Sequence, residues 1–416
     1  MTDLPSSFGS AAPLEGLRII DLSTYVAGPS GSLTLAQLGA DVIRIDPLGG
    51  APDVRRLPLA PSGQSLFWAG LNKGKRSVEI NVGTEEGRRL VERLIALPGA
   101  EGGILITNAV GQPWLSYEQM RRHREDVIKV FIRGRSDGKA AVDYTVNAEM
   151  GLPWLTGPLE STRPVNHVLP AWDLMTGIYA AMAVVTAERV RSRSGRGQRI
   201  EIDLASVAVA TMANLGYVAD VQINGAKRVR DGNFFYGGFG CDFRTGDDQR
   251  IMIVALTPRH WRNLTELTGV ADLVDRLEES LGADFRTDAD RYAHRRVLSD
   301  LIRPWFKSRP LTAAIDGLEK AGILWGRYRS IDAMVNEADS LMHMSGIMHE
   351  VEQPGIGTYS VPGSVFGFSD WGPDAPVPAP RLGEHTDQVL HELLAVQPDE
   401  LSDLRRRSVI GGRSGD

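Results

Sequence analysis

The sequence predicts an α/β protein, with a Rossmann-like, doubly wound parallel sheet in a large domain and a smaller α/β domain after it. Short segments rich in Val and Ile alternate with segments of helical periodicity over the first half of the chain. Several helical segments open on Thr, Ser or Glu, which are common near helix starts. The chain has 416 residues, 42% of them hydrophobic, which is enough for a large core and two domains.

The elements alternate in the order expected for βαβ units, whose strands lie parallel. The first strand is followed by "TYVAGPSGS", which lacks the G-x-G-x-x-G fingerprint, so a nicotinamide or flavin enzyme is not expected. We expect strands at 17–23, 41–46, 77–82, 103–108, 127–134 and 199–204. We expect helices at 31–40, at 84–97, from 174 into the basic run 188–198 whose glycines end it, and after 204 to 225.

The composition changes near residue 225, where "DGNFFYGGFGCDF" is rich in glycine and aromatic residues. We expect a large domain over 1–224 and a small domain over 225–333. The remaining segment, 334–416, contains many prolines, which predict extended segments rather than a third core.

Composition and motifs also exclude several classes of protein. The net charge of −6 argues against a nucleic-acid partner, and the single cysteine, Cys241, excludes an intrachain disulfide and fits the cytoplasm. No signal peptide is expected, and no apolar run reaches the ~20 residues of a membrane span. The eight histidines are scattered and no metal-binding motif is present, so we expect no metal site.

One carboxylate stands at the start of an unusually apolar helical segment. Asp173 in "VNHVLPAWDLMTG" precedes residues 174–187, which carry no charge. Asp173 is either an N-cap, because Asp accepts hydrogen bonds from free backbone N–H groups, or a nucleophile that the positive end of the helix keeps ionised. The residues alone leave both alternatives open.

A series of phrases along the chain resembles one family. In order, they are "PLEGLRIIDLS…AGP", "QLGADVIRIDPLGG", "FWAGLNKGKRSVEI", "LITN", "AWDLMTG", "SGRGQRIEIDL" and "APRLGEHTDQVL". Together they are similar to the class III CoA-transferases, the formyl-CoA transferase and carnitine CoA-transferase family, over nearly the whole chain. The resemblance implies the class III CoA-transferase fold, an interlocked homodimer, and a C-terminal segment that returns to the large domain.

In that family the Asp of a D-x-x-x-G pattern is the nucleophile, and Asp173 and Gly177 match the pattern. The resemblance therefore implies that Asp173 attacks an acyl-CoA thioester and becomes first a mixed anhydride and then an aspartyl-CoA thioester. CoA enters as part of the substrate, and no permanently bound cofactor is expected. Gly177, which has no side chain, is expected to let the thioester approach closely.

The resemblance also implies contacts to CoA. Three basic residues, Lys73, Lys75 and Arg76 in "NKGKRS", are further candidates, although a solvated turn explains them equally well. The positions that match CoA-contacting positions of the family are Val26, Ala27, Ile80, Asn81 and the next two residues, Asn108, and Arg133, which replaces the family's usual Lys.

At two positions the chain departs from sequence patterns found in the family, and these departures reduce the number of reactions that we expect. Formyl-CoA transferases that use oxalate have Gln where this chain has Val26, and the racemases of the same fold have His where it has Val142. Val cannot transfer a proton, so racemisation is not expected. Within the family, the phrases "VDYTVN", "GLPWLTGP", "VNHVLPAWD" and "VEQPGIGTY" resemble members that transfer CoA between the two carboxyls of one methylated fumarate, and the resemblance implies this reaction. The alternatives are transfer from a dicarboxylyl-CoA to a separate acid, and a non-catalytic acyl-CoA-binding protein.

Four residues are candidates for the substrate pocket. Asn166 and His167 could hold the free carboxylate of a small dicarboxylic acid, although a structural histidine is equally compatible. Gly237 and Gly238 in "YGGFG" could belong to a lid that excludes water, or simply form a turn.

Overall fold

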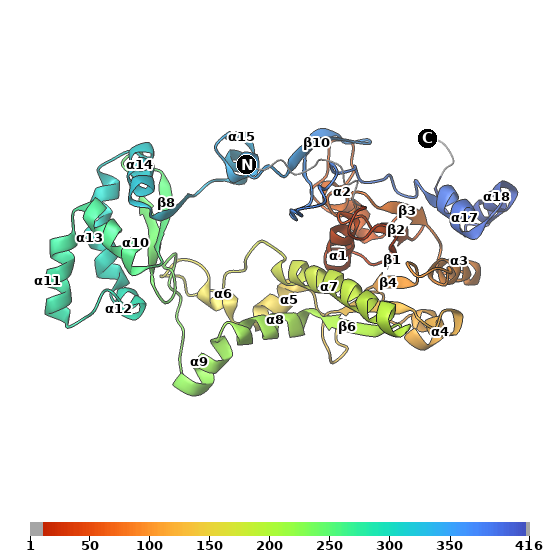
Figure 1. Ribbon diagram of the computed structural model, residues 1–416, viewed down its shortest axis with the longest axis horizontal. Helices are drawn as coiled ribbons and strands as arrows, with labels where there is room; N and C mark the ends of the chain where they lie inside the picture. The colour runs from red at the N-terminus through yellow and green to blue at the C-terminus, as the bar shows by residue number, and fades with distance from the viewer. Residues whose placement is uncertain (1–10, 413–416) are drawn as a thin grey trace. The chain divides into compact units, whose positions relative to one another are not determined.

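The structure is a computed structural model that describes residues 11–412. The described residues divide into two compact units: a large unit of residues 11–150, 168–225 and 345–412, and a small unit of residues 151–167 and 226–344. The predicted α/β class is confirmed, because the large unit contains a parallel six-stranded sheet with helices on both faces (Figure 1).

The large sheet has the strand order β3-β2-β1-β4-β5-β6, and every neighbouring pair is parallel. The chain reverses its direction of travel across the sheet between β1 and β4, which is the topological switch point of a Rossmann-like sheet. The strands are β1 Arg18–Leu22, β2 Asp41–Asp46, β3 Arg76–Glu79, β4 Ile104–Thr107, β5 Ile128–Arg133 and β6 Arg199–Asp203.

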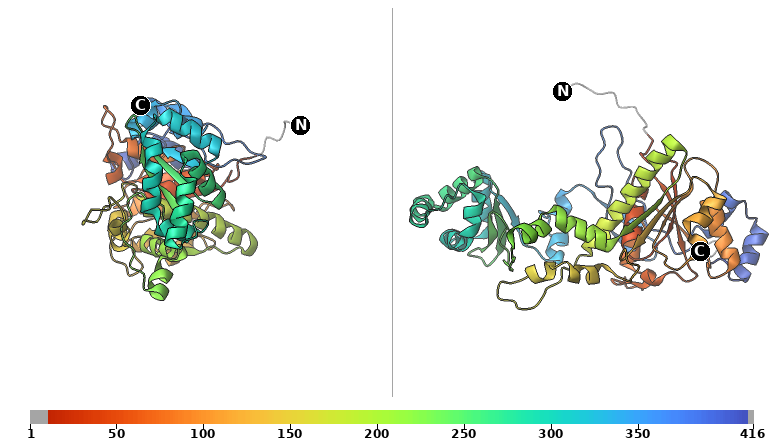
Figure 2. Two further views of the ribbon diagram at one scale, coloured as in Figure 1. Left: turned by 90° about the vertical axis from the view of Figure 1, so that its left-hand side faces the viewer. Right: turned by 90° about the horizontal axis from the view of Figure 1, so that it is seen from below.

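Two sets of helices cover the sheet, one on each face (Figure 2). One face carries α1 Ala27–Ala36, α7 Ala171–Ser194 and α8 Leu204–Asn214. The other carries α3 Glu85–Ile95, α4 Tyr117–His123, α17 Thr386–Leu394 and α18 Pro398–Arg406. Leu90, Leu105 and Leu390 lie in one buried cluster, so the last helices of the chain complete the core of the large unit. Shorter elements are η1 Pro52–Arg55, α2 Leu66–Leu71, η2 Pro113–Leu115, α5 Asp143–Glu149, α9 Tyr217–Asn224, β10 Met348–Gln353 and β11 Gly357–Pro362.

The small unit has its own antiparallel sheet, in the order β7-β8-β9, packed against helices. Phe243 and Phe306 stack in its core with ring centroids 4.4 Å apart. Its strands are β7 Phe239–Arg244, β8 Arg250–Ala255 and β9 Leu324–Arg327. Its helices are α6 Leu152–Leu155, α10 Pro258–Thr268, α11 Ala271–Leu281, α12 Asp288–Ala293, α13 Arg295–Lys307, α14 Leu311–Ala321, α15 Ile331–Asn336 and α16 Leu341–Met344.

The division of the chain differs from the predicted boundaries in two places. Residues 151–167 belong to the small unit, because the buried Arg230 guanidinium donates hydrogen bonds to the carbonyls of Pro153, Ser161 and Arg163. The small unit also continues past 333 to 344, where Glu337 accepts hydrogen bonds from Arg327 of β9. Any residue can supply the backbone carbonyls that Arg230 contacts, so the first of these two differences leaves no signal in the sequence.

The helix expected over 204–225 is divided in two. It ends at Asn214 and restarts at Tyr217, because Gly216 adopts a left-handed backbone conformation with φ of 82°. No single helix within residues 11–412 is long and apolar enough to cross a membrane, whereas α8 and α9 together, bent by 58°, meet that length and composition.

Candidate active site

The carboxyl ends of the central strands surround a cavity of about 350 Å³. Ser23, Thr24 and Tyr25 line it directly after β1, Asn108 follows β4, and Ile80 follows β3. Ligands of open α/β sheets bind in this crevice, outside the carboxyl ends of strands at the switch point. Two residues predicted to contact CoA, Ile80 and Asn108, therefore line a cavity suited to a ligand.

The side chain of Asn108 holds the loop after β1 in place. Its Oδ1 accepts from the N–H of Thr24 (3.1 Å), and its Nδ2 donates to the carbonyl of the same residue (3.0 Å). The next residue, Tyr25, has φ of 69°, which is uncommon for a residue with a side chain. Its N–H donates to Asp53 Oδ2 at 2.9 Å. Val26 and Ala27 then begin α1 and are buried.

A network of buried charges lies behind this loop. Arg44 pairs with Asp46 (2.9 Å) and with Asp53 (3.0 Å), and Lys75 pairs with Asp21 (3.2 Å). All five side chains are buried. Because Asp53 also holds Tyr25, the network positions both the loop before α1 and the 3₁₀ helix η1.

Two lysines that the sequence suggested as CoA ligands, Lys73 and Lys75, form hydrogen bonds within the protein. The Nζ of Lys75 donates to Asp21, to the carbonyl of Pro29 and to Asn72. Burial lowers the pKa of Lys75 to about 8, against the opposing effect of Asp21. Lys73 is also buried, and its Nζ donates to the carbonyl of Gly70. Neither lysine presents a free ammonium to a phosphate.

The other predicted CoA-contacting residues are also bound to protein groups. Arg76 pairs with Asp41 and with Glu392 (3.2 Å), and Arg133 pairs with Glu201 (3.1 Å). Asn81 Nδ2 donates to the carbonyl of Ser408 at 3.0 Å, which ties the C-terminal segment to the end of β3. The structure thus gives Lys75, Arg76 and Asn81 contacts that stabilise the fold.

Asp173 lies in the first turn of α7, two residues after the helix begins at Ala171. It is not the N-cap, which is Pro170, and its side chain accepts no hydrogen bond within residues 11–412. The capping alternative is therefore wrong, and the reason is that another residue supplies the cap. Oδ2 of Asp143 accepts from the N–H of Trp172 (2.7 Å) and from the N–H of Asp173 (3.1 Å).

The electrostatic environment of Asp173 also differs from the expectation. Burial, the larger cause, and the negative charge of Asp143 together raise its pKa to about 6, against the opposing effect of Arg56. The helix end therefore does not hold the pKa at its ordinary value. At neutral pH the carboxylate is still mostly ionised, and it is more basic than an exposed Asp.

Arg56 directly follows η1, and its exposed side chain lies near two aromatic rings. The guanidinium carbon is 5.8 Å from the ring centroid of Tyr25 and 4.8 Å from that of Phe67. Arg56 and Asp143 are the two site residues that the sequence reading missed. For Asp143, "VDYTVN" carries the signal of an acidic first helical turn, but nothing in that signal points to the start of another helix.

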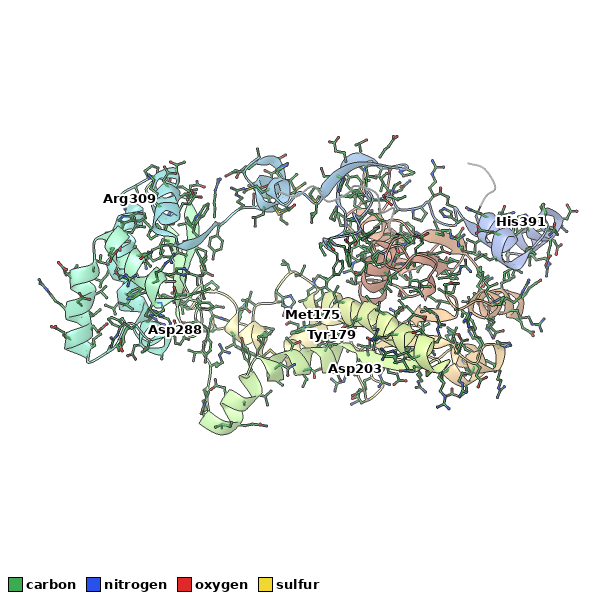
Figure 3. The ribbon with its side chains drawn as sticks, in the orientation of Figure 1. Met175, Tyr179, Asp203, Asp288, Arg309 and His391 are labelled. Carbon is green, nitrogen blue, oxygen red and sulfur yellow. The ribbon has the colours of Figure 1, made fainter. Side chains whose placement is uncertain are left out.

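Gly177 has a role other than the predicted one. A Cβ atom at Gly177 would lie 2.1 Å from Ser30 Oγ and 2.8 Å from the carbonyl oxygen of Ala27. The opposing Gly31 would likewise meet the Gly177 carbonyl at 2.6 Å. Gly177 therefore lets α7 pack directly on the start of α1, which places Asp173, one turn earlier, beside the N-terminal end of α1 (Figure 3 labels Met175 and Tyr179 on this part of α7).

We expect Gly177→Ala to lower the free energy of unfolding by ~1–3 kcal/mol, because a backbone carbonyl must move to admit the methyl group. Turnover falls with it, because α7 carries Asp173. Gly70→Ala in α2 is the matched control, since no atom lies within 4 Å of its Cβ position. Urea unfolding and turnover are measured for both variants. Equal stability of the two would show that the helices do not need this glycine.

The remaining candidates lie in the small unit. Both ring nitrogens of His167 are buried and have no hydrogen-bond partner in the described part of the chain, and Asn166 is exposed. Gly237, with φ of 78°, forms an exposed turn before β7, and Gly238 is buried against the ring of Phe235. Their roles toward the substrate stay predictions.

Fold and site together define an α/β protein with a ligand cavity at the switch point of its sheet and a half-buried carboxylate at the start of a nearby helix. The model of CoA-transferase family III matches residues 14–386, and the chain belongs to this family of enzymes. The resemblance found in the sequence is thereby confirmed.

Two relatives and one solved structure show the range of similarity. The chain is 44% identical to 2-methylfumaryl-CoA isomerase of Chloroflexus aurantiacus, covering 96% of this chain and 98% of the relative. It is 29% identical to succinyl-CoA:mesaconate CoA-transferase of Haloarcula marismortui, covering 91% of this chain and 96% of the relative. The crystal structure of a CaiB/BaiF family protein from Brucella suis aligns with a TM-score of 0.76 at 25% identity, over 92% of this chain and all of that one.

Proposed function

We propose that the enzyme is a 2-methylfumaryl-CoA isomerase, which moves CoA between the C1 and C4 carboxyls of 2-methylfumarate (mesaconate). The observation that carries the proposal is the 44% identity over nearly the full length of an enzyme with this activity. The geometry supports it, because the chemistry needs a carboxylate that is positioned, ionised and free of hydrogen-bond donors, and Asp173 meets these requirements.

The first half of the reaction captures CoA on the protein. An oxygen of Asp173 attacks the thioester carbonyl carbon, the C–S bond breaks, and CoA leaves as a thiolate, which gives a mixed anhydride. The thiolate then attacks Cγ of Asp173, the bond from Cγ to the bridging oxygen breaks, and mesaconate is released as a dianion. Asp173 is now an aspartyl-CoA thioester.

The second half reverses these steps with the other end of the acid. Mesaconate turns within the pocket, and its second carboxylate attacks Cγ of the aspartyl thioester, which expels the thiolate. The thiolate attacks the substrate carbonyl of the new anhydride and restores the Asp173 carboxylate. Each step exchanges one activated acyl bond for another, so the reaction needs no ATP.

Arg56 is suited to hold the free carboxylate of the bound acid. It acts electrostatically on Asp173, its side chain is exposed, and the aromatic rings of Tyr25 and Phe67 limit its movement. His167 and Asn166 are further candidates for the same carboxylate. Gly237 and Gly238 are candidates for a lid that keeps water from the anhydride.

CoA is proposed to bind with its nucleotide in the cavity at the switch point. Asn108 and Ile80 line this cavity, and the start of α1 at Val26 and Ala27 adjoins both the cavity and Gly177 of α7. The pantetheine arm can follow the start of α1 toward Asp173. The proposal assigns Lys75 and Arg76 no contact to CoA, since Lys75 pairs with Asp21 and Arg76 with Asp41.

The enzyme is also proposed to work as a homodimer. Apolar side chains spaced three and four residues apart on α7 are exposed in the single chain: Ile178 (59%), Met182 (55%) and Val185 (42%). An apolar stripe of this kind on a helix is typical of an interface. Light scattering in solution is expected to give twice the 45.3 kDa of one chain, and a mass of one chain would contradict the proposal.

A second function has one specific observation in its favour. The relative at 29% identity is a succinyl-CoA:mesaconate CoA-transferase, whose name describes transfer between two acids. The first test is to incubate the purified protein with mesaconyl-C1-CoA and no added acid. The isomerase converts it to the C4 thioester, and an enzyme that needs a separate acceptor leaves it unchanged.

A further inference from the structure

We propose that Asp143 is a positioning residue for the nucleophile: it caps the helix that carries Asp173 and destabilises the free Asp173 carboxylate relative to its acylated forms. This inference rests on the proposed function, which assigns covalent chemistry to Asp173.

The contacts place Asp143 at the start of α7 although it belongs to α5. Its Oδ2 accepts hydrogen bonds from the N–H groups of Trp172 and Asp173. An N-cap side chain directly before α7 would otherwise be the acceptor for these groups. Trp172 is held a second time, because its Nε1 donates to Oδ1 of Asn147 at 3.3 Å. Two side chains of α5 therefore determine where the first turn of α7 lies.

Apart from these two backbone N–H groups, no described residue donates a hydrogen bond to the Asp143 carboxylate or forms an ion pair with it. Its side chain is buried, its Oδ1 has no hydrogen-bond partner, and it forms no ion pair within residues 11–412. The N-terminal end of one helix thus lies beside two carboxylates, Asp143 and Asp173. The charge of Asp143 raises the pKa of Asp173, and repulsion between two like charges favours whichever state leaves one of them neutral.

The other charged groups around Asp173 do not remove this repulsion. Among the described residues, Arg56 is the one cation that acts on Asp173, and it is exposed, so solvent weakens its effect. Helices α1 and α8, which pack on α7, contain no charged residue. On β5 and β6, Lys129 binds a backbone carbonyl, Arg133 and Arg199 pair with Glu201, and Asp203 caps α8.

Acylation of Asp173 relieves the repulsion. When its carboxylate oxygen bonds to the acyl carbon and the thiolate leaves, Asp173 becomes neutral, and it stays neutral as the aspartyl-CoA thioester. The Asp143 charge therefore favours the covalent intermediates over the free carboxylate. It also makes the attacking carboxylate more basic, which increases its nucleophilicity.

The test replaces the charge and keeps the hydrogen-bond acceptor. In Asp143→Asn the side-chain oxygen can still accept from Trp172 and Asp173. Asp203→Asn is the matched control, since Asp203 Oδ1 caps α8 by accepting from Ser206 N–H at 2.8 Å and is not among the groups that act on Asp173 (Figure 3). Asp143→Ser, a smaller neutral acceptor, serves if the Asn variant does not fold.

The first readout needs no turnover. A carbodiimide with an added amine labels protonated carboxyls, and peptide mass spectrometry follows labelling of Asp173 between pH 4 and 8. The wild type is expected to lose labelling with a midpoint near pH 6, and Asp143→Asn with a midpoint lower by about one pH unit or more. Asp203→Asn is expected to match the wild type. An unchanged midpoint in both Asp143 variants would overturn the inference.

The second readout measures the intermediate. With mesaconyl-C1-CoA present, acid quenching and intact-mass analysis give the fraction of chains that carry an acyl or CoA adduct. Asp143→Asn is expected to carry a several-fold smaller fraction than the wild type and Asp203→Asn, and an equal fraction would overturn the inference. If the midpoint shifts while the wild type forms no adduct, the proposed function fails and the positioning role stands.

Discussion

Asp173→Asn is expected to abolish turnover while the protein stays folded. The amide keeps the size of the carboxyl but is a very weak nucleophile, so no anhydride forms and the rate falls at least about 10³-fold. The assay is the conversion of mesaconyl-C1-CoA to the C4 isomer, followed by liquid chromatography. Asp203→Asn is the control, because it changes a buried carboxylate of the same unit that caps α8, and it is expected to keep near-normal turnover.

The same substitution is expected to stabilise the folded state at pH 7–8. The folded-state pKa of Asp173, about 6, lies above its ordinary value of 3.8. The stabilising effect of the proton is therefore complete below about pH 4 and is lost as the pH rises through 6. Above that range the ionised carboxylate costs the fold roughly 1–3 kcal/mol, which the neutral Asn removes.

Urea unfolding at pH 7.5 and at pH 5 separates this effect from a simple packing change. The gain in stability of Asp173→Asn over the wild type is expected at pH 7.5 and shrinks at pH 5. A variant that retains a tenth of wild-type turnover would show that Asp173 is not the nucleophile. A variant that is less stable than the wild type at both pH values would show that the carboxylate is not destabilising.

The sheet was predictable because its signals are local. Val- and Ile-rich strands such as Asp41–Asp46, separated by capped helices such as Glu85–Ile95 after Thr84, carry their pattern within a few residues. The break between α8 and α9 was not expected, because Gly216 can occupy either a helical or a left-handed conformation and the sequence does not say which. The boundary at 151–167 depends on Arg230, more than sixty residues away.

The sequence could predict a site residue where its role follows from its own side chain, but not where the role depends on a contact with a residue distant in the sequence. Asp173 stood out because a carboxylate before an uncharged helix is unusual. Whether it caps that helix depended on Asp143, thirty residues earlier, and no pattern in the sequence joins the two. For Gly177 the D-x-x-x-G pattern indicated importance, but the reason, contact with Ser30 and Ala27, is a property of the packed helices. Lys75 appeared free for phosphate until the fold placed Asp21 beside it.

The isomerase and the two-acid transferase differ in what happens to the acid after CoA is captured on Asp173. In the isomerase the released mesaconate stays in the pocket, so its second carboxylate attacks without leaving. Well-placed groups reach effective molarities of about 10⁵ M or more, against which free acid at millimolar concentration cannot compete. The acid in the product is therefore the acid that entered as the thioester.

An isotope experiment measures this directly. Unlabelled mesaconyl-C1-CoA is mixed with the enzyme and an excess of ¹³C-mesaconate, and both thioesters are followed by mass spectrometry. An intramolecular transfer predicts that the C4 thioester accumulates without label until isomerisation is complete. Label that enters the C4 thioester as fast as the isomer forms would contradict it and would identify the enzyme as a CoA-transferase between separate acids.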